Sequence, residues 1–240
     1  MEKEKKETVY DIDVMVADES HEKYVDTILE TIEDSAKVRG TGIAKRSRDY
    51  VAQKMREGKV IIALDGDEFA GFTYIESWGN KQYVATSGLI VADRFRNQGL
   101  ARRIKHASFQ LARLRWPKAK LFSLTSGSAV MKMNTELGYF PVTFADLTDD
   151  EAFWRGCNGC SNYDVLVRTQ RRYCICTAML FDPSDERCIL LEKMCHSFAQ
   201  KEAKKRKAEQ RNGTASLQQN DKNNNNIQNG KEKEKSSSSL

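Results

Sequence analysis

Three apolar segments joined by two tight turns constrain the fold of this 240-residue chain more than any other feature. The segments Lys59–Leu64, Phe69–Trp78 and Tyr83–Val91 have the length and composition of β-strands. They are separated by Asp65-Gly66-Asp67 and by Gly79-Asn80, and dipeptides of this kind close β-hairpins. The three segments are therefore expected to be antiparallel neighbours in one sheet.

Helices and further strands alternate on both sides of these segments. Apolar residues recur at helical spacing over residues 21–36, and Ser47 is placed to cap a helix that stops at Gly58. A long helix is predicted from Gly99 to about Trp116, with Leu114 in its apolar stripe. The remaining expected elements are strands over residues 14–17, 121–125, 139–144, 162–168 and 173–181, and a helix over residues 129–137. This order predicts an α/β protein with a mixed, mostly antiparallel sheet flanked by helices.

The positive charge of the chain is concentrated at its C-terminal end. The formal net charge is +5, but residues 201–240 hold ten Lys or Arg and five Asp or Glu, and residues 1–200 hold 29 of each. A neutral folded region argues against a broad nucleic-acid-binding face. No apolar run is long enough to span a membrane and no apolar stretch follows Met1, so we expect a cytoplasmic protein without a membrane partner.

Composition also divides the chain into segments. We expect a charged segment over residues 1–10, a folded domain over 11–183 and a helix over 184–200. Residues 201–240 are rich in Lys, Asn and Ser and have almost nothing apolar to bury, which predicts a disordered basic and polar tail.

The segment Arg96-Asn97-Gln98-Gly99-Leu100-Ala101 lies between an apolar strand and the start of the long helix. Backbone N–H groups at a helix start attract anions, and a glycine allows a phosphate to approach them closely. Arg102 adds a positive charge beside this turn. The alternative is a turn glycine beside arginines that face solvent, and the spacing leaves both interpretations open.

The residues from Gly88 to Ala101 resemble the signature of the GNAT superfamily of acyl-CoA N-acyltransferases, an Arg/Gln-x-x-Gly-x-Gly/Ala motif directly after the fourth strand. The resemblance extends from about Val14 to Phe144, and the expected order of elements is that of the GNAT fold. It implies an acyl-CoA co-substrate, acetyl-CoA or another, whose pyrophosphate binds the amides of residues 98–101.

The resemblance also implies that the pantetheine arm of the coenzyme pairs with the strand residues Leu89, Ile90 and Val91. Gly88 lies within that strand, and a glycine there indicates a β-bulge. A bulge would help to separate this strand from the one over residues 121–125, opening the slot that the family uses for the thioester.

The second family motif appears as Asn134-Thr135-Glu136-Leu137-Gly138-Tyr139. Many members have a tyrosine four residues before this glycine, and it protonates the departing thiolate. Asn134 stands in that position, and an amide does not donate a proton in this way, so the acid is solvent, Tyr139 or no group at all.

Glu76 is the candidate base, since a carboxylate near the end of a strand can accept the proton of an amine through water. An exposed carboxylate without a catalytic role is the alternative. His106 lies within the basic helix and is interpreted as a surface residue.

Four cations, Arg39, Lys45, Arg46 and Arg48, surround two glycines in the segment that joins the first two helices. This is where the family builds its acceptor site, and arginine forks bind carboxylates. The alternative is a solvated basic loop. The stretch from Thr125 to Val142 also resembles the GNAT domain of bacterial N-acetylglutamate synthases, which act in arginine biosynthesis.

All six cysteines fall between Cys157 and Cys195. Cys157-x-x-Cys160 is followed after 13 residues by Cys174-x-Cys176, within an insert expected at about residues 145–176. Four thiolates in two close pairs suit a structural zinc ion; an iron–sulfur cluster and unligated thiols are the alternatives. Cys188 and Cys195 are interpreted as core thiols.

Together these features predict an N-acyltransferase that moves an acyl group from acyl-CoA to the amine of a small carboxylated acceptor. Glutamate or another amino acid of arginine biosynthesis is the first candidate, and a protein or peptide amine is the alternative within the class. The rival is a non-catalytic binding module that uses the four-cysteine zinc site and the basic tail. Asn134, which is not an acid, favours this rival. A homodimer is a possible assembly, and the sequence does not separate an acetyl from a succinyl donor.

Overall fold

A computed structural model describes residues 10–39, 46–195, 197, 200 and 201. Met1–Glu192 forms one compact unit and Lys193–Leu240 a second, whose described residues are helical. The first unit contains, in chain order, β1 (Ile12–Val16), the 3₁₀-helix η1 (Glu19–Tyr24), α1 (Val25–Arg39), α2 (Arg48–Arg56), β2 (Val60–Asp65), β3 (Glu68–Trp78), β4 (Tyr83–Val91), η2 (Asp93–Phe95), α3 (Leu100–Arg115), β5 (Lys120–Thr125), α4 (Ser128–Glu136), β6 (Phe140–Val142), η3 (Phe144–Asp146), α5 (Glu151–Arg155), α6 (Tyr163–Arg168) and β7 (Thr177–Phe181).

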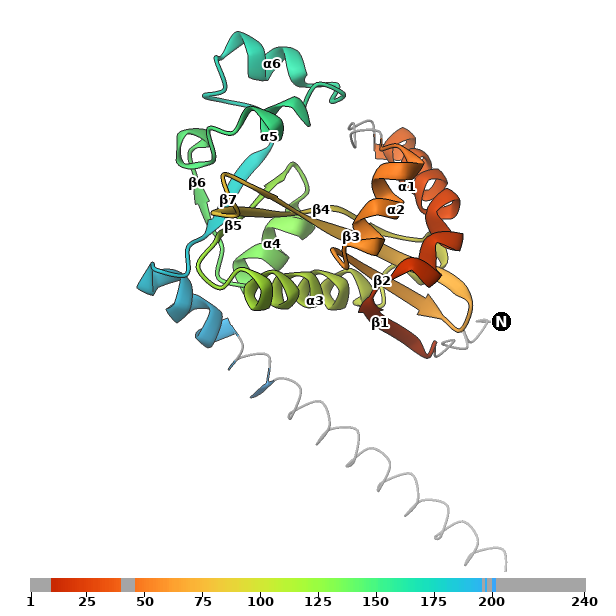
Figure 1. Cartoon of the computed structure of the whole chain (residues 1–240). Helices are drawn as coiled ribbons and strands as arrows, with labels where there is room; N and C mark the ends of the chain where they lie inside the picture. The colour runs from red at the N-terminus through yellow and green to blue at the C-terminus, as the bar shows by residue number, and fades with distance from the viewer. Residues whose placement is uncertain (1–9, 40–45, 196, 198–199, 202–240) are drawn as a thin grey trace, which may run out of the picture. The chain divides into compact units, whose positions relative to one another are not determined.

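The seven strands form one sheet in the order β1-β2-β3-β4-β5-β7-β6 (Figure 1). β4 and β5 pair in parallel, and the other five neighbouring pairs are antiparallel. Both expected hairpins are present, and Gly66 and Gly79 have φ angles of 59° and 54° in their turns. The prediction of an α/β protein with a mixed, mostly antiparallel sheet is confirmed.

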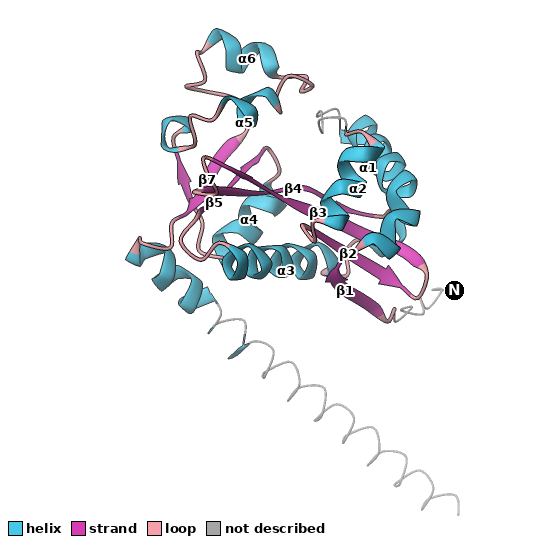
Figure 2. Cartoon of the chain, viewed as in Figure 1, coloured by secondary structure: helices cyan, strands magenta, loops and turns pink. Residues whose placement is uncertain are grey.

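Helices cover both faces of the sheet (Figure 2). Successive strand residues point to opposite faces. Accordingly Ile62 of β2 packs in the core cluster that holds Ile28 of α1 and Met55 of α2, whereas Ile61 packs with Ile104 of α3. α3 therefore lies on the face opposite α1 and α2, which puts the two sides of β4 in contact with different helices.

The insert between β6 and β7 is helical and packs through aromatic side chains. Phe153 and Trp154 of α5 share a core cluster with Ala85 of β4, Phe122 of β5 and Leu180 of β7. The insert thus covers the part of the sheet around β5 and β7.

Four expectations from the sequence are wrong in detail. The strand predicted over residues 162–168 is the helix α6, and the strands predicted over 139–144 and 173–181 are shortened to β6 and β7. Leu114, which was expected in the apolar stripe, lies in the last turn of α3 and is 81% exposed.

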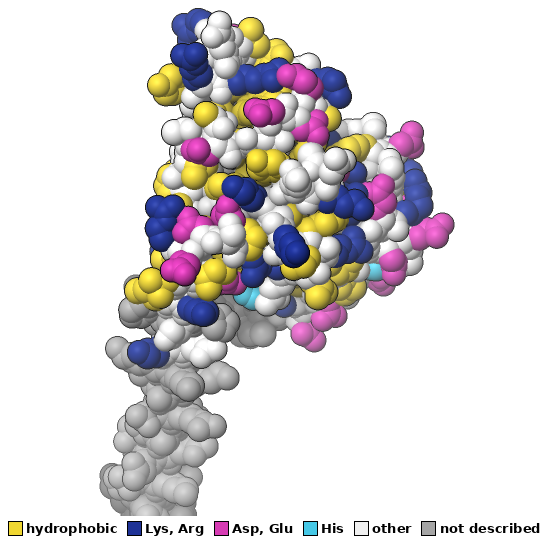
Figure 3. Space-filling view, turned by 60° about the vertical axis from the view of Figure 1, so that its left-hand side comes forward, with side chains coloured by type: hydrophobic (Ala, Val, Ile, Leu, Met, Phe, Trp, Pro, Cys, Tyr) yellow, Lys and Arg dark blue, Asp and Glu magenta, His cyan; other side chains and the backbone are white. Residues whose placement is uncertain are grey.

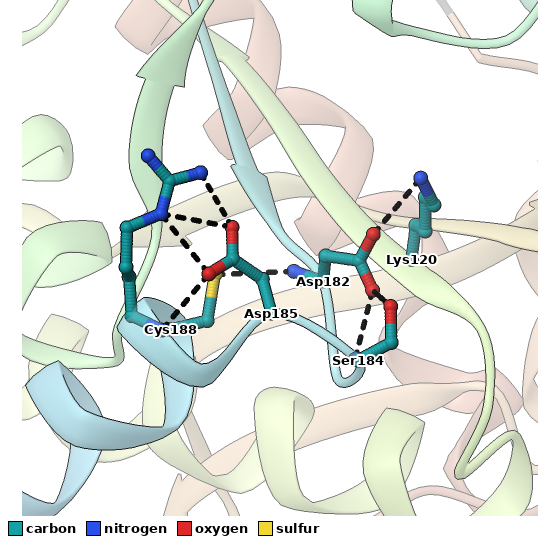
Figure 4. Close-up of polar contacts among 6 residues, drawn as sticks. Lys120, Asp182, Ser184, Asp185 and Cys188 are labelled. Atoms are coloured by element: carbon teal, nitrogen blue, oxygen red, sulfur yellow. Dashed lines mark hydrogen bonds and ion pairs between the residues drawn. The ribbon is translucent and has the colours of Figure 1, made fainter.

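The turn that follows β7 is fixed by side-chain contacts (Figure 4). The Asp182 carboxylate accepts hydrogen bonds from Ser184 and lies 2.9 Å from the Lys120 ammonium group. The Asp182 backbone N–H donates to the Cys188 sulfur at 3.3 Å. Cys188 is buried in the core, which confirms its interpretation as a core thiol, and residues 186–195 are helical.

Charge on the face drawn in Figure 3 is mixed, with Lys and Arg side chains interspersed among Asp and Glu. Among the described residues, no helix has both the length and the apolar composition that crossing a membrane requires.

Candidate active site

The chain turns sharply before α3. Asn97 and Gly99 have φ angles of 64° and 77°, and Asn97, Gln98 and Gly99 are all exposed. Gly99 is the N-cap of α3, and its carbonyl accepts the first two helical hydrogen bonds at 3.1 and 3.2 Å. A Cβ atom on Gly99 would meet no protein atom within 4 Å. Because the first N–H groups of a helix have no partner within it, those of Leu100 and Ala101 can bind an anion here.

The arginines beside this turn have partners within the protein. The Arg96 side chain donates to the Val91 carbonyl at 3.1 Å and lies 2.7 Å from the Asp93 carboxylate. Arg102 pairs with Glu136 of α4 at 3.0 Å. These contacts fix the shape of the turn, so an anion bound here would depend mainly on the backbone of α3.

Hydrogen bonding between β4 and β5 stops after the pair Ala85–Phe122. β4 stays paired with β3 as far as Val91, and β5 stays paired with β7 as far as Thr125. The two strands therefore part while each remains in the sheet. The edge of β4 that includes Leu89, Ile90 and Val91 has no pairing with β5, and an extended ligand chain can hydrogen-bond to such an edge.

A β-bulge lies on the same part of β4. Phe72 pairs with Ile90 and Tyr74 with Ser87, so that two residues of β4 oppose a single residue of β3. Gly88 in this bulge has a φ of 68°, and a Cβ atom there would lie 2.8 Å from a ring carbon of Tyr74. The bulge predicted from this glycine is confirmed.

Glu76, near the end of β3, is held by three donors. The Tyr50 hydroxyl donates to Glu76 Oε2 at 2.7 Å, and the Lys54 ammonium group lies 2.7 Å from the same oxygen. The Ser77 backbone N–H donates to Oε1 at 3.2 Å. The Glu76 side chain is 16% exposed, so it is mostly buried beside a buried cation. No sequence motif marks Lys54 or Tyr50 as partners, because they lie in α2, far away along the chain.

Arg46 joins this group through aromatic side chains. Its Nε donates to the Tyr74 hydroxyl at 2.7 Å, and its guanidinium carbon lies 5.8 and 5.7 Å from the ring centroids of Tyr50 and Tyr74. The two rings meet edge to face at 5.7 Å. Burial is the main cause that raises the pKa of Tyr50, so its hydroxyl stays protonated and donates to Glu76.

The other cations of the predicted acceptor loop are placed differently. Arg48 lies 3.2 Å from Asp26 of α1 in an exposed ion pair. Arg39 is the last residue of α1, and Lys45 lies outside the described residues. Among the described members of the set, Arg46 is the residue whose contacts lead to Glu76.

Asn134 and Tyr139 are fully buried between α4, the sheet and α3. Asn134 Nδ2 donates to the Met179 sulfur at 3.5 Å, and its Oδ1 has no hydrogen-bond partner. The Tyr139 hydroxyl also has none, and burial raises the pKa of that phenol. A phenol with a raised pKa is a weak proton donor, so this environment does not favour Tyr139 as the acid.

Lys105 is a buried cation that the sequence analysis did not single out. It lies in α3, is 2% exposed, and donates to the Thr86 hydroxyl at 2.5 Å. A sequence signal was present: Ser108, Phe109 and Ala112 are small or apolar and stand three, four and seven residues after Lys105, which places Lys105 on a helix face that can pack on the sheet.

A cavity of about 470 Å³ does not coincide with this site. It lies in the insert, between α5 and α6, and Trp154, Tyr163 and Leu166 are among its lining residues. It shares no residue with the turn at Gly99 or with the contacts of Glu76. For this reason we do not assign the coenzyme to this cavity.

The four cysteines of the insert influence one another electrostatically. Burial is the main cause that raises the pKa of Cys157, and the neighbouring Cys160 and Cys174 raise it further. The pKa of Cys176 rises to about 12, again through burial first and then through the other three thiols. Within the part of the chain that the structure describes, however, no three His, Cys, Asp or Glu side chains form a group able to hold a metal ion. The predicted zinc site is not supported by this arrangement.

Comparison with known proteins identifies the fold. No family model matches the chain, and a search of curated proteins finds no match. The structure is similar to N-acetylglutamate synthase from Neisseria gonorrhoeae complexed with coenzyme A and N-acetyl-glutamate, with a TM-score of 0.53 and 15% identity over 74% of this chain. It is also similar to Rv2747 from Mycobacterium tuberculosis in complex with CoA, with a TM-score of 0.51 and 15% identity.

The two matches differ in their extent. The matched region covers 71% of this chain and 98% of Rv2747, but 36% of the Neisseria synthase. The matched region therefore corresponds to nearly the whole of Rv2747 and leaves most of the longer synthase unmatched. The chain has the fold of the GNAT acyl-CoA N-acyltransferases.

Proposed function

We propose that this protein is an acyl-CoA N-acyltransferase that acts on a small carboxylated amine. The observation that carries the proposal is the unpaired edge of β4, which begins beyond Ala85 and leads to the helix start at Gly99. One extended ligand with an anionic end fits this arrangement, because the edge offers backbone hydrogen bonds and the helix start offers N–H groups to phosphate.

The coenzyme would lie along this edge. Its pyrophosphate would bind the N–H groups at residues 98–101, and its pantetheine arm would pair with Leu89, Ile90 and Val91. Its thioester would then lie toward Thr86, where β4 and β5 part. Similarity to structures that contain coenzyme A supports this placement.

The acceptor would approach from the face of α1 and α2. Glu76 would take a proton from the attacking amine through water, since it lies at the end of β3 on that face. Lys54 and Tyr50 hold Glu76 in one orientation through contacts of 2.7 Å to its Oε2 atom. Arg46 would bind the acceptor carboxylate, because an arginine fork matches a carboxylate in shape and charge.

Glutamate is the first acceptor to test. The Neisseria synthase was solved with N-acetyl-glutamate, and Arg46 supplies a cation suited to a carboxylate. A protein or peptide amine is the alternative acceptor. A screen of free amino acids, decarboxylated amines and peptides with acetyl-CoA and succinyl-CoA, read by release of free thiol, identifies both the donor and the acceptor.

The screen also tests the proposal against a non-catalytic role. Thiol release that depends on a carboxylated amine supports the enzyme. Tight coenzyme binding without transfer to any amine or peptide would instead indicate a binding module, and absence of coenzyme binding would rule out the proposed function altogether.

A structural zinc ion at Cys157, Cys160, Cys174 and Cys176 is a separate proposal. It rests on the spacing of the two pairs, because four thiolates suit tetrahedral zinc. Elemental analysis of protein purified without chelator tests it. One zinc per chain, lost in Cys160→Ser but not in Cys188→Ser, would support the site, whereas four freely titratable thiols would refute it.

A further inference from the structure

Lys105 is a buried amine that the proposed reaction has not yet used. Its Nζ donates to the Thr86 hydroxyl at 2.5 Å and lies 5.5 Å from the centroid of the Tyr139 ring. No carboxylate among the described residues is paired with it. Burial alone lowers its pKa to about 7. A lysine without a counter-ion in a packed interior costs stability that an apolar side chain of similar length would not.

The position of Lys105 relates it to the candidate coenzyme slot. Thr86, its hydrogen-bond partner, is the first residue of β4 beyond the last β4–β5 pair, Ala85–Phe122. The amine therefore lies where the two strands part, at the inner end of the unpaired edge. Tyr139, whose ring centroid lies 5.5 Å from the amine, belongs to the segment between α4 and β6.

The neighbouring groups do not supply a proton donor. Asn134 stands where an acid is expected from the family resemblance, and its amide is not an acid. The Tyr139 phenol has a pKa raised by burial, and its hydroxyl has no partner to which it could pass a proton. Lys105 has N–H groups beyond the one that Thr86 accepts, because an ammonium group carries three donors.

We propose that the Lys105 ammonium group donates a proton to the sulfur of coenzyme A as the thioester breaks. This assignment rests on the proposed function. The acceptor amine forms a C–N bond with the carbonyl carbon, the C–S bond breaks, and its electron pair passes to sulfur. Sulfur takes the proton of Lys105, the proton of the amine leaves through Glu76, and Lys105 regains a proton from solvent.

The near-neutral pKa of Lys105 suits this role, because both of its protonation states are populated at physiological pH and transfer in either direction is efficient. The groups that face Lys105 do not titrate in this range. Thr86 of β4 is not ionisable in this range, and burial raises the pKa of Tyr139, so its phenol stays protonated. A fall in kcat/KM for acyl-CoA on the alkaline side, with a midpoint near neutral pH, can thus be attributed to Lys105.

The first test compares Lys105→Met with the wild type in the transfer reaction. Methionine keeps the unbranched chain and removes the amine, and Lys118→Met, at an exposed position just after α3, is the matched control. We expect kcat to fall about 10²- to 10⁴-fold in Lys105→Met, with the dissociation constant for coenzyme A within about twofold of the wild type. The alkaline limb of kcat/KM for acyl-CoA should disappear in Lys105→Met and persist in Lys118→Met.

A second measurement needs no acceptor and separates this inference from the proposed function. In complexes with coenzyme A, ultraviolet absorbance follows ionisation of the thiol. We expect the thiol to ionise at a pH lower by about one unit or more in the wild-type complex than in the Lys105→Met complex, because Lys105 can hold a proton when the sulfur loses its own, and the ammonium group and the thiolate then stabilise each other.

The outcomes are distinct. Equal thiol pKa values in the two complexes, or a kcat of Lys105→Met within threefold of the wild type, would overturn the role of Lys105 and leave the proposed function intact. Parallel losses of kcat and coenzyme affinity would show a packing role and overturn it as well. A wild type that binds no coenzyme would refute the proposed function, and this inference with it.

Discussion

Gly99 combines a backbone conformation that favours glycine with an open space at the start of a helix. Its φ is 77°, and a Cβ atom added to it would have no protein atom within 4 Å, so no neighbouring group in the protein needs this residue to be small. The requirement comes from the left-handed backbone and, in our proposal, from a phosphate that must approach the N–H groups.

Gly99→Glu is expected to abolish coenzyme A binding, because it places a negative side chain over the anion site. Isothermal titration calorimetry measures this loss directly. Gly66→Glu is the matched control, since Gly66 also has a positive φ of 59° and nothing within 4 Å, but lies in the β2–β3 hairpin. Equal coenzyme affinity in the wild type and Gly99→Glu would remove the phosphate site from the proposal.

Arg46 and Arg48 are two residues apart, and the structure assigns them different surroundings. Arg46 contacts Tyr74 beside the Glu76 group, and Arg48 pairs with Asp26 on the surface. We expect Arg46→Ala to raise KM for a carboxylated amine roughly ten- to a hundredfold, the effect of losing a charged hydrogen bond. Arg48→Ala should change it by less than about threefold, because exposed ion pairs contribute little.

Steady-state kinetics with a carboxylated amine and with its decarboxylated counterpart test this difference. Arg46→Ala should leave KM for acyl-CoA nearly unchanged and affect the decarboxylated amine much less. If both amines respond alike, Arg46 supports the structure of the site and does not bind the carboxylate.

Among the elements, the strand β4 shows how a single residue shapes the site. Gly88→Ala would combine a positive φ with a Cβ atom 2.8 Å from the Tyr74 ring. We expect a loss of about 1 to 3 kcal/mol in the free energy of unfolding, measured by denaturant titration, from backbone strain and overpacking. Gly127→Ala is the control, since Gly127 has a negative φ of −94° and its nearest contact would be 3.6 Å. If Gly88→Ala leaves the free energy of unfolding unchanged, the β-bulge accommodates the added Cβ atom.

The hairpins and the bulge were predictable because glycine at a turn or within a strand has a local cause. The helix α6 was not, since Asp164-Val165-Leu166-Val167 has the β-branched composition of a strand and periodicity cannot decide so short a run. In the structure Leu166 packs in the insert's core cluster and Val167 is 56% exposed, so these two apolar residues do not share a buried environment.

The candidate site was predictable to the extent that it depends on local sequence. The turn at Gly99 follows from a glycine before a helix. The contacts of Glu76 with Tyr50 and Lys54 join β3 to α2, and the contact of Lys105 with Thr86 joins α3 to β4. Such pairs form only when the sheet and its helices are assembled, so a search for local motifs does not detect them.

For the whole molecule, the buried Lys105 links stability to pH. Its pKa is about 7 in the folded protein and about 10.4 in an unfolded chain. Between these values the unfolded state binds a proton that the folded state does not, so this residue makes stability rise with pH, by up to about 1.4 kcal/mol per pH unit. Below pH 7 both states are protonated and the slope from this residue vanishes.

Other buried groups oppose this trend at alkaline pH. Burial raises the pKa values of Tyr139 and Cys176, so the unfolded state releases their protons first and stability falls above the unfolded values of about 10 and 8.5. The measurement is therefore the difference in free energy of unfolding between the wild type and Lys105→Met, followed by denaturant titration from pH 6 to 10. We expect this difference to shift in favour of the wild type as pH rises above 7. Two parallel curves would show that Lys105 keeps its proton in the folded protein throughout this range, which would contradict a pKa near 7.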